Sequence, residues 1–61
     1  MKASLKVLSV PIGYLTVSGN ECPQDGVYLS TNDNHRTICR KGEFIPQRNG
    51  FDVTYRLEAY W

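Results

Sequence analysis

Residues 51–61, FDVTYRLEAYW, alternate between apolar and polar side chains over almost their whole length. Side chains of a strand point in turn to its two faces, so this spacing predicts one long strand with a buried face and a solvated face. The apolar members are Phe51, Val53, Tyr55, Leu57, Ala59 and Trp61. Val53, Tyr55 and Leu57 occupy the middle of that face, and we expect them to be among the most buried residues. The preceding Asn49-Gly50 pair favours a tight hairpin turn, whose two central positions both need a positive φ.

Four further segments have the length and composition of short strands: residues 3–10, 14–18, 27–31 and 35–40. Turn-forming Gly, Pro, Asn and Asp residues separate them. In residues 14–18, either Leu15 and Val17 or Tyr14 and Thr16 face inward. No segment of eight or more residues combines helical periodicity with an N-terminal cap. The sequence therefore predicts an all-β, mainly antiparallel fold with little or no helix, either a single small sheet or an SH3/OB-like barrel of about five short strands.

The length of 61 residues predicts one domain that spans residues 1–61. A chain of this size buries only about 60% of the surface that its unfolded form exposes, and a partner chain is one way to enlarge its core. The expected strand over residues 3–10 carries apolar side chains on both faces, and the last strand ends on an aromatic pair. We therefore expect a homodimer, with Leu8, Val10, Tyr60 and Trp61 as candidate interface residues.

The first residues resemble a secretion signal only in part. Met1-Lys2 precedes several apolar residues, but Lys6 interrupts them, Pro11 follows soon after, and a small-residue cleavage site is missing. We interpret residues 1–20 as part of the fold, with a cleaved signal as the alternative. No stretch reaches the roughly twenty apolar residues of a membrane span. The expected location is the cytoplasm, without membrane attachment.

The charged residues give one candidate binding face. Seven basic and six acidic residues leave a net charge of +1, far below that of most dedicated nucleic-acid binders. The basic residues nevertheless gather between positions 35 and 48, and Tyr28 is expected on a neighbouring strand. The face comprises Tyr28, His35, Arg36, Arg40, Lys41 and Arg48. It is typical either of a surface that holds single-stranded nucleic acid by charge and stacking, or of a solvated strand that resists aggregation.

Two cysteines, Cys22 and Cys39, are the remaining chemically distinctive side chains. They are interpreted as buried free thiols or as a disulfide, which would require an oxidising compartment. His35 is the only other soft metal ligand, so the four ligands of a structural zinc site are not available. Four residues of strand put His35 and Cys39 roughly 13 Å apart, too far for these two to form a Cys-His catalytic pair, although Cys22 could in principle approach either of them. We therefore expect no catalytic residues, no metal, no cofactor and no enzymatic activity.

A final pattern runs through the middle of the chain. Residues 22–28 read CPQDGVY, and a basic segment leads from there to KGEFIP at residues 41–46. This arrangement resembles a short β module of small bacterial and prophage proteins. The residues that carry the resemblance are Cys22, Pro23, Gly26, Tyr28, Gly42, Phe44 and Pro46. The resemblance implies an accessory protein of a phage or other mobile element.

Two functional hypotheses follow. The first is a small non-catalytic accessory protein that binds another protein and acts as a homodimer. Its basis is the absence of a catalytic constellation, the small net charge and the supply of Tyr and Trp, which dominate binding hot spots. The second is a single-stranded nucleic-acid-binding small β-barrel that uses the Arg36/Arg40 face. The sequence does not identify the protein partner.

Overall fold

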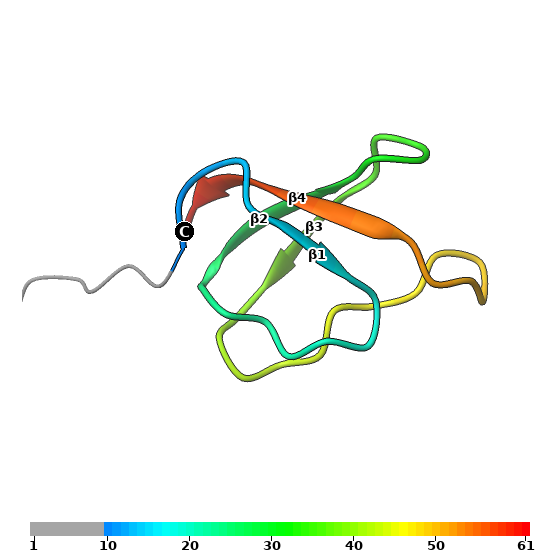
Figure 1. The fold of residues 1–61 in the computed structure, drawn as a ribbon, viewed down its shortest axis with the longest axis horizontal. Helices are drawn as coiled ribbons and strands as arrows, with labels where there is room; N and C mark the ends of the chain where they lie inside the picture. The colour runs from blue at the N-terminus through cyan, green and yellow to red at the C-terminus, as the bar shows by residue number, and fades with distance from the viewer. Residues whose placement is uncertain (1–9) are drawn as a thin grey trace, which may run out of the picture.

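The computed structural model describes residues 10–61, and this part of the chain contains strands and no helix (Figure 1). The strands are β1 (Leu15–Val17), β2 (Gly26–Ser30), β3 (Arg36–Cys39) and β4 (Thr54–Tyr60). They form one open antiparallel sheet in the order β1-β4-β2-β3. The expectation of an all-β, antiparallel fold is confirmed, and β4, from the alternating stretch at the end of the chain, is the longest of the four.

The expectation of about five strands or a closed barrel is not confirmed. Within residues 10–61, β1 pairs only with β4 and β3 pairs only with β2, so both are edge strands. Residues 3–9 of the expected first strand lie outside the described residues, and its last residue, Val10, is in a bend. The described chain is therefore a single four-stranded sheet with two edges.

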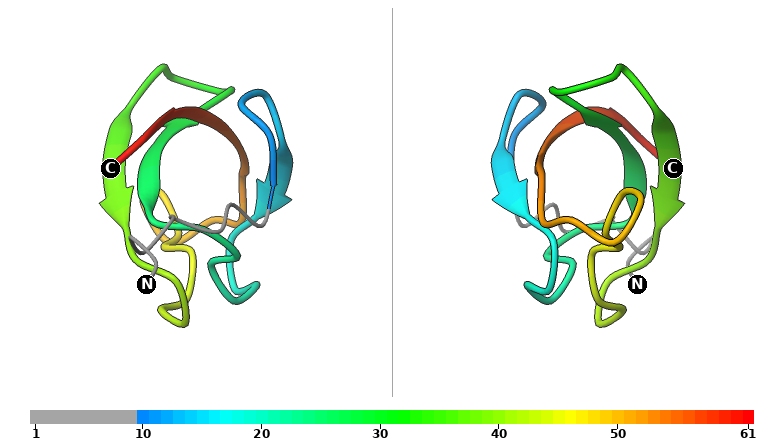
Figure 2. Two further views of the ribbon diagram at one scale, coloured as in Figure 1. Left: turned by 90° about the vertical axis from the view of Figure 1, so that its left-hand side faces the viewer. Right: turned by 90° about the vertical axis from the view of Figure 1, so that its right-hand side faces the viewer.

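The sheet is strongly curled, and two long connections cover the side that its strands leave open (Figure 2). These connections pair with each other through backbone hydrogen bonds. Gly19 N–H donates to Ile45 O at 2.8 Å, Ile45 N–H to Asn20 O at 2.8 Å, and Cys22 N–H to Glu43 O at 2.6 Å. The pairing satisfies backbone groups that burial would otherwise leave without partners. It also brings Cys22 and Ile45 into the core.

The core lies on the concave face of the sheet. Its buried members are Cys22, Tyr28, Cys39, Ile45, Val53, Tyr55 and Leu57, with the half-buried Val10 packed against them. Tyr28 and Leu57 are directly opposite each other on β2 and β4, and both are 0% exposed. Tyr55 is also fully buried, beside Ser30 of β2. The predicted burial of Val53, Tyr55 and Leu57 is thus confirmed.

A β-bulge interrupts the alternation of β4. Tyr28 pairs with Leu57, whereas the adjacent Val27 pairs with Ala59, which leaves Glu58 as an extra residue on β4. Directly paired residues lie on the same face, so Ala59 shares the convex face with Val27. Trp61 follows it to that side, where Arg40 covers its ring. The expectation that Ala59 and Trp61 lie on the buried face is therefore wrong.

The hairpin before β4 forms as its sequence predicts. Asn49 and Gly50 have φ values of 53° and 82°, and Arg48 and Phe51 exchange two backbone hydrogen bonds of 2.9 Å. These features define a two-residue turn with positive φ at both central positions. Phe51 closes this turn instead of entering the core, and its side chain is exposed. Its expected place on the buried face is also wrong.

The core assignment predicts a large difference between two leucines. Leu57→Ala should lower the free energy of unfolding by about 2–5 kcal/mol, because it removes a fully buried side chain from the centre of the core. Leu15→Ala is the matched control, because Leu15 is 57% exposed and its loss should change stability by about 0.5 kcal/mol or less. Urea unfolding followed by circular dichroism measures both. Equal midpoints for the two variants would contradict the assigned faces.

Two buried tyrosines provide a second test. The Tyr28 hydroxyl donates to Gln24 O at 2.6 Å, whereas the buried Tyr55 hydroxyl has no hydrogen-bond partner among residues 10–61. Tyr28→Phe should cost about 0.5–1.5 kcal/mol, because it removes the shorter of two hydrogen bonds to Gln24 O and leaves only the weak thiol donor Cys22 at 3.2 Å. Tyr55→Phe should be neutral or stabilise by up to about 1 kcal/mol, because it removes a desolvated hydroxyl. The same unfolding experiment measures both, and a larger loss for Tyr55→Phe would refute this description of the core.

Candidate protein-binding surface

The largest group of exposed apolar residues along one short segment belongs to β1 and the turn before it. We define Ile12, Tyr14, Leu15 and Val17 as the β1 patch, all of which are exposed. On β1 itself, Thr16 turns into the core while Leu15 and Val17 point away from it. Of the two orientations that the sequence leaves open for Leu15 and Val17, the structure has the outward one. A threonine therefore fills the inner position, and two aliphatic side chains face solvent.

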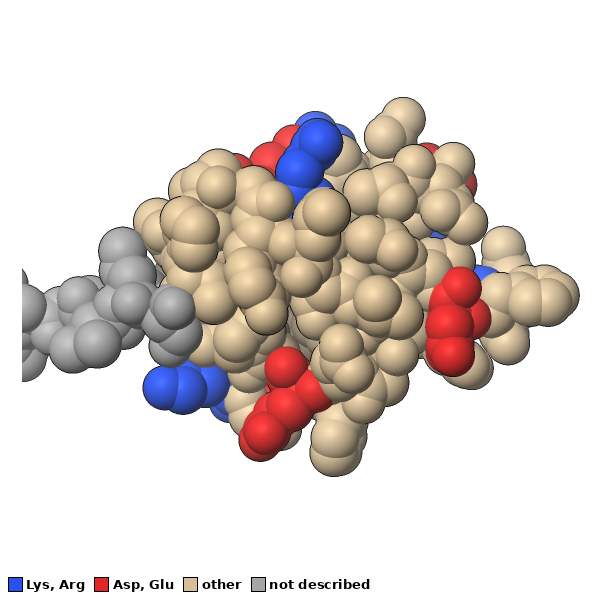
Figure 3. All heavy atoms as spheres, viewed as in Figure 1, with Lys and Arg blue, Asp and Glu red and all other residues tan. Residues whose placement is uncertain are grey.

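Among residues 10–61, the edge beside the β1 patch lacks the features that usually protect an edge strand. Natural edges carry charges, bulges or covering segments that prevent pairing with another chain. Residues 7–20 contain no charged residue, and Figure 3 shows an uncharged surface across the middle of the face on which β1 lies. Leu57 N–H donates to Tyr14 O and Ser18 N–H donates to Val53 O, which sets the pairing with β4. The N–H groups of Leu15 and Val17 consequently point away from β4, towards the edge.

The opposite edge of the sheet has a different chemistry. On β3, Ile38 is exposed and adjoins a small hollow lined by Val27, Arg36, Thr37 and Ile38. Beyond it, the Arg40 guanidinium lies 4.2 Å from the centroid of the Trp61 ring, and Trp61 is 50% exposed. The bulge at Glu58 places the indole here. The β3 edge therefore carries both apolar and positively charged side chains, whereas the β1 edge is uncharged.

The predicted basic face separates into several environments. Tyr28 is buried in the core and cannot contribute to an exposed face. Arg36 pairs with Glu58 through two hydrogen bonds of 2.6 and 3.1 Å, and the two side chains pass over Leu29. Arg48 donates to Asp33 at 2.9 and 3.1 Å. Most of the positive charge of Arg36 and Arg48 is thus locally neutralised.

The other members of the predicted face are exposed. His35 lies at the end of the β2–β3 turn, where its backbone N–H donates to Asp33 at 3.3 Å. The backbone N–H of Lys41 donates to Asp25 at 2.6 Å. Arg40 covers Trp61. The structure brings Arg40 and Lys41 together near the end of the chain, but it does not bring Arg48 to the same surface as Arg36.

The candidate interface residues also differ in their surroundings. Leu8 lies outside the described residues. Val10 is half-buried against the core, and its carbonyl accepts a hydrogen bond of 3.0 Å from the Tyr60 hydroxyl. Tyr60 therefore contacts its own chain, whereas the Trp61 ring lies on the other face of the sheet. The residues expected in one interface thus belong to two sides of the molecule.

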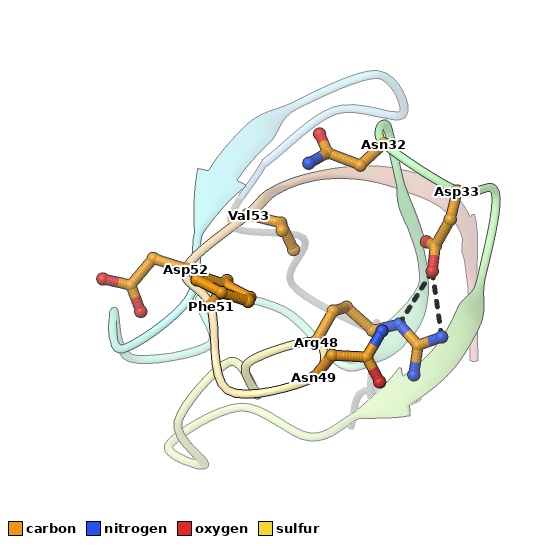
Figure 4. Close-up of a pocket in the computed structure, with 7 residues that line it drawn as sticks. All are labelled: Asn32, Asp33, Arg48, Asn49, Phe51, Asp52 and Val53. Atoms are coloured by element: carbon orange, nitrogen blue, oxygen red, sulfur yellow. Dashed lines mark hydrogen bonds and ion pairs between the residues drawn. The ribbon is translucent and has the colours of Figure 1, made fainter.

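A hollow of about 500 Å³ lies beside the hairpin turn and is lined by Asn32, Asp33, Arg48, Asn49, Phe51, Asp52 and Val53 (Figure 4). Arg48 and Asp33 line the hollow and hydrogen-bond to each other, and Asp52 points away from both of them. Among residues 10–61, no three His, Cys, Asp or Glu side chains are close enough to hold a metal ion. The hollow also has no pair of groups arranged for acid-base chemistry. Residues 10–61 as a whole include no membrane-spanning helix.

The comparisons with known proteins give no family. The chain matches no family model and no curated protein, and its structure matches no solved structure. The surface must therefore be interpreted from its own residues. Sequence reasoning missed the β1 patch, although the charge-free stretch over residues 7–20 was a usable signal.

The Arg36–Glu58 pair makes a prediction about titration. The hydrogen bonds from Arg36 lower the pKa of Glu58, with a smaller contribution from the charge of Arg56. Because this pKa is lower in the folded state, the pair stabilises the fold above the unfolded pKa of about 4.3, and that contribution is lost as the pH falls through the folded pKa. Arg36→Gln should raise the pKa of Glu58 more than Arg56→Gln does. Carboxyl-detected NMR titration of the three proteins measures this, and an unchanged Glu58 in Arg36→Gln would show that the pair does not form in solution.

Proposed function

We propose that this chain is a small non-catalytic protein-binding protein that acts as a homodimer, and that the β1 patch forms its interface. The observation that carries the proposal is an exposed apolar patch on an edge strand without protecting charges. The N–H groups of Leu15 and Val17 face this edge and can pair with another strand, whereas the Val17 C=O already accepts a hydrogen bond from Asn20 N–H at 3.1 Å. The occupant of this edge is a second copy of the same β1.

Two copies of β1 are self-complementary. Around a two-fold axis at Thr16, Leu15 of one copy lies opposite Val17 of the other, and both are apolar and exposed. The same patch then serves both subunits, as a two-fold interface requires. The absence of charge in residues 7–20 means that this pairing brings no like charges together. Pairing at β3 would instead bring Arg36 and Arg40 of the two copies close to each other.

The small size of the chain adds a reason to associate. A continuous sheet across two subunits would pack Leu15 against Val17 of the partner subunit and so cover part of the β1 patch of a 61-residue domain. The resemblance to a module of small prophage proteins supports a role as an accessory protein of a phage or other mobile element, in the cytoplasm. In that role the dimer would present its second edge, β3, to the protein that it binds.

A substitution on only one sheet edge at a time tests the proposed dimer. Sedimentation equilibrium from micromolar to hundred-micromolar concentrations should detect a dimer for the native chain. Val17→Glu should raise the dimer Kd at least tenfold, because it places two carboxylates in the interface. Ile38→Glu, which changes an apolar residue on the other edge that is also exposed, should leave the Kd unchanged. Circular dichroism of both variants checks the fold.

Two results would refute this interface. A native chain at monomer mass throughout the concentration range would exclude the homodimer. Loss of dimer in Ile38→Glu, with Val17→Glu still dimeric, would move the contact from β1 to β3.

A second function is supported by the Arg40–Trp61 contact. A half-exposed indole beside a guanidinium is the type of platform on which single-stranded nucleic acids stack, with charge provided to their phosphates. Trp61 is the only tryptophan, so its own fluorescence reports binding directly. A titration with oligonucleotides at low and moderate salt should quench it if this function holds, and Arg40→Gln should weaken the effect. No salt-sensitive quenching at micromolar protein would exclude the nucleic-acid hypothesis.

A further inference from the structure

The two cysteines come from distant parts of the chain and meet in the core. Cys22 lies in the connection between β1 and β2, and Cys39 is the last residue of β3. Their exposed fractions are 1% and 3%, and both belong to the same cluster of buried residues. Neither is in a disulfide in this structure. The sequence left open whether these cysteines form a disulfide, and the structure shows that both are buried in the same cluster.

Three contacts place the thiols in one small region. The Cys22 Sγ lies 3.5 Å from the Tyr28 hydroxyl, and Tyr28 and Cys39 are on the same concave face of the neighbouring strands β2 and β3. The Cys22 backbone pairs with Gly42 and Glu43 through hydrogen bonds of 3.0 and 2.6 Å. The Cys39 Sγ contacts the carbonyl of the next residue, Phe44, at 3.8 Å. Both cysteines are thus fixed to the same three-residue segment, residues 42–44.

The electrostatics agree with this geometry. Burial, followed by the charge of Cys22 and a hydrogen bond to its thiol, raises the pKa of Cys39 to about 12. The two thiols therefore act directly on each other. Opposite Cys39 on β2 is Gly26, where the Leu57 side chain and the Ala59 backbone occupy the space that a side chain would need.

We propose that Cys22 and Cys39 are a redox pair that closes to an intrachain disulfide when the chain folds in the presence of a small-molecule disulfide. In the first step one protein thiolate attacks the oxidant R–S–S–R, which forms a mixed disulfide and releases one R–S⁻. The second protein thiolate then attacks the protein sulfur of that mixed disulfide and expels the second R–S⁻. The two protons lost by the cysteines are taken up by the two R–S⁻ groups. The protein is oxidised by two electrons and the oxidant is reduced to two thiols.

The folded chain itself resists this reaction. The thiolate is the reactive form, and the raised pKa of Cys39 keeps its thiol protonated at neutral pH. Neither sulfur is accessible to an oxidant outside the core. The exchange therefore proceeds through the unfolded or opened chain, and the redox state is set at the time of folding. The closed disulfide restricts the unfolded chain and should raise the Tm by on the order of 10 °C.

The experiment compares oxidation during folding with oxidation after folding. The reduced full chain is unfolded in urea and refolded in a mixture of oxidised and reduced glutathione, while a second sample is folded first and then receives the same mixture. Intact mass and free-thiol titration should show the loss of two hydrogens and both thiols in the first sample, and little change in the second. The oxidised protein should have the higher Tm, and dithiothreitol added during unfolding should reverse the gain. Cys22→Ser and Cys39→Ser are the controls, because each keeps one thiol, cannot form the intrachain bond and should show no gain in Tm.

Three results would contradict the assignment of Cys22 and Cys39 as a redox pair. Refolded native chain that carries two glutathione adducts, or disulfides between chains, would show that the two sulfurs do not reach each other. An intrachain disulfide that leaves the Tm equal or lower would show that the pair is not compatible with the native fold. Equal oxidation rates for the folded and unfolded samples would contradict control by folding. The native chain supplies all three readouts, so the result does not depend on whether the serine variants fold.

Discussion

The packing of Tyr28 against Leu57 across β2 and β4 is the contact on which the rest of this domain depends. These strands are the two central members of the sheet, and each also positions one edge strand. The Tyr28 hydroxyl reaches beyond the sheet to Gln24 O and so fixes the loop that carries Cys22. Because the described core has few side chains, each one contributes a large share of a small total stability. Residues 10–61 contain no second cluster of buried residues that could compensate for the loss of this one.

The bulge at Glu58 determines what the sheet presents to solvent. Before it, the odd-numbered residues of β4 fill the core. After it, Ala59 and Trp61 cross to the convex face, where the indole meets Arg40. Glu58 itself points over Leu29 to Arg36 and neutralises it. This one extra residue thus ends the row of buried side chains on β4 and brings Trp61 next to Arg40. It also lets Glu58 neutralise the charge of Arg36. Bulges often serve to redirect side chains at the ends of sheets in this way.

The two edges of the sheet suit different types of partner. The β1 edge is uncharged and apolar, which favours a second copy of itself, because identical surfaces meet without charge repulsion. The β3 edge combines Ile38 with Arg40 and Lys41, which favours a partner of different composition. Association across β1 and a disulfide between Cys22 and Cys39 would each support a core that is small for an independent domain. They act on different parts of the molecule and are independent of each other.

The β class, the Asn49-Gly50 turn and the burial of Val53, Tyr55 and Leu57 could be predicted from the amino-acid sequence, because each depends on a local repeat or on the φ preference of two residues. The point at which the alternation of β4 stops could not be predicted in this way, since a bulge depends on how the neighbouring strand β2 pairs, and the packing of the folded chain decided it. It likewise decided that Tyr28 is a core residue and that Leu15 and Val17 face outward around a buried Thr16. Period-two spacing defines two faces of a strand but not which of them meets the core. That choice is made by the strands and loops that pack against it, which come from distant positions in the chain.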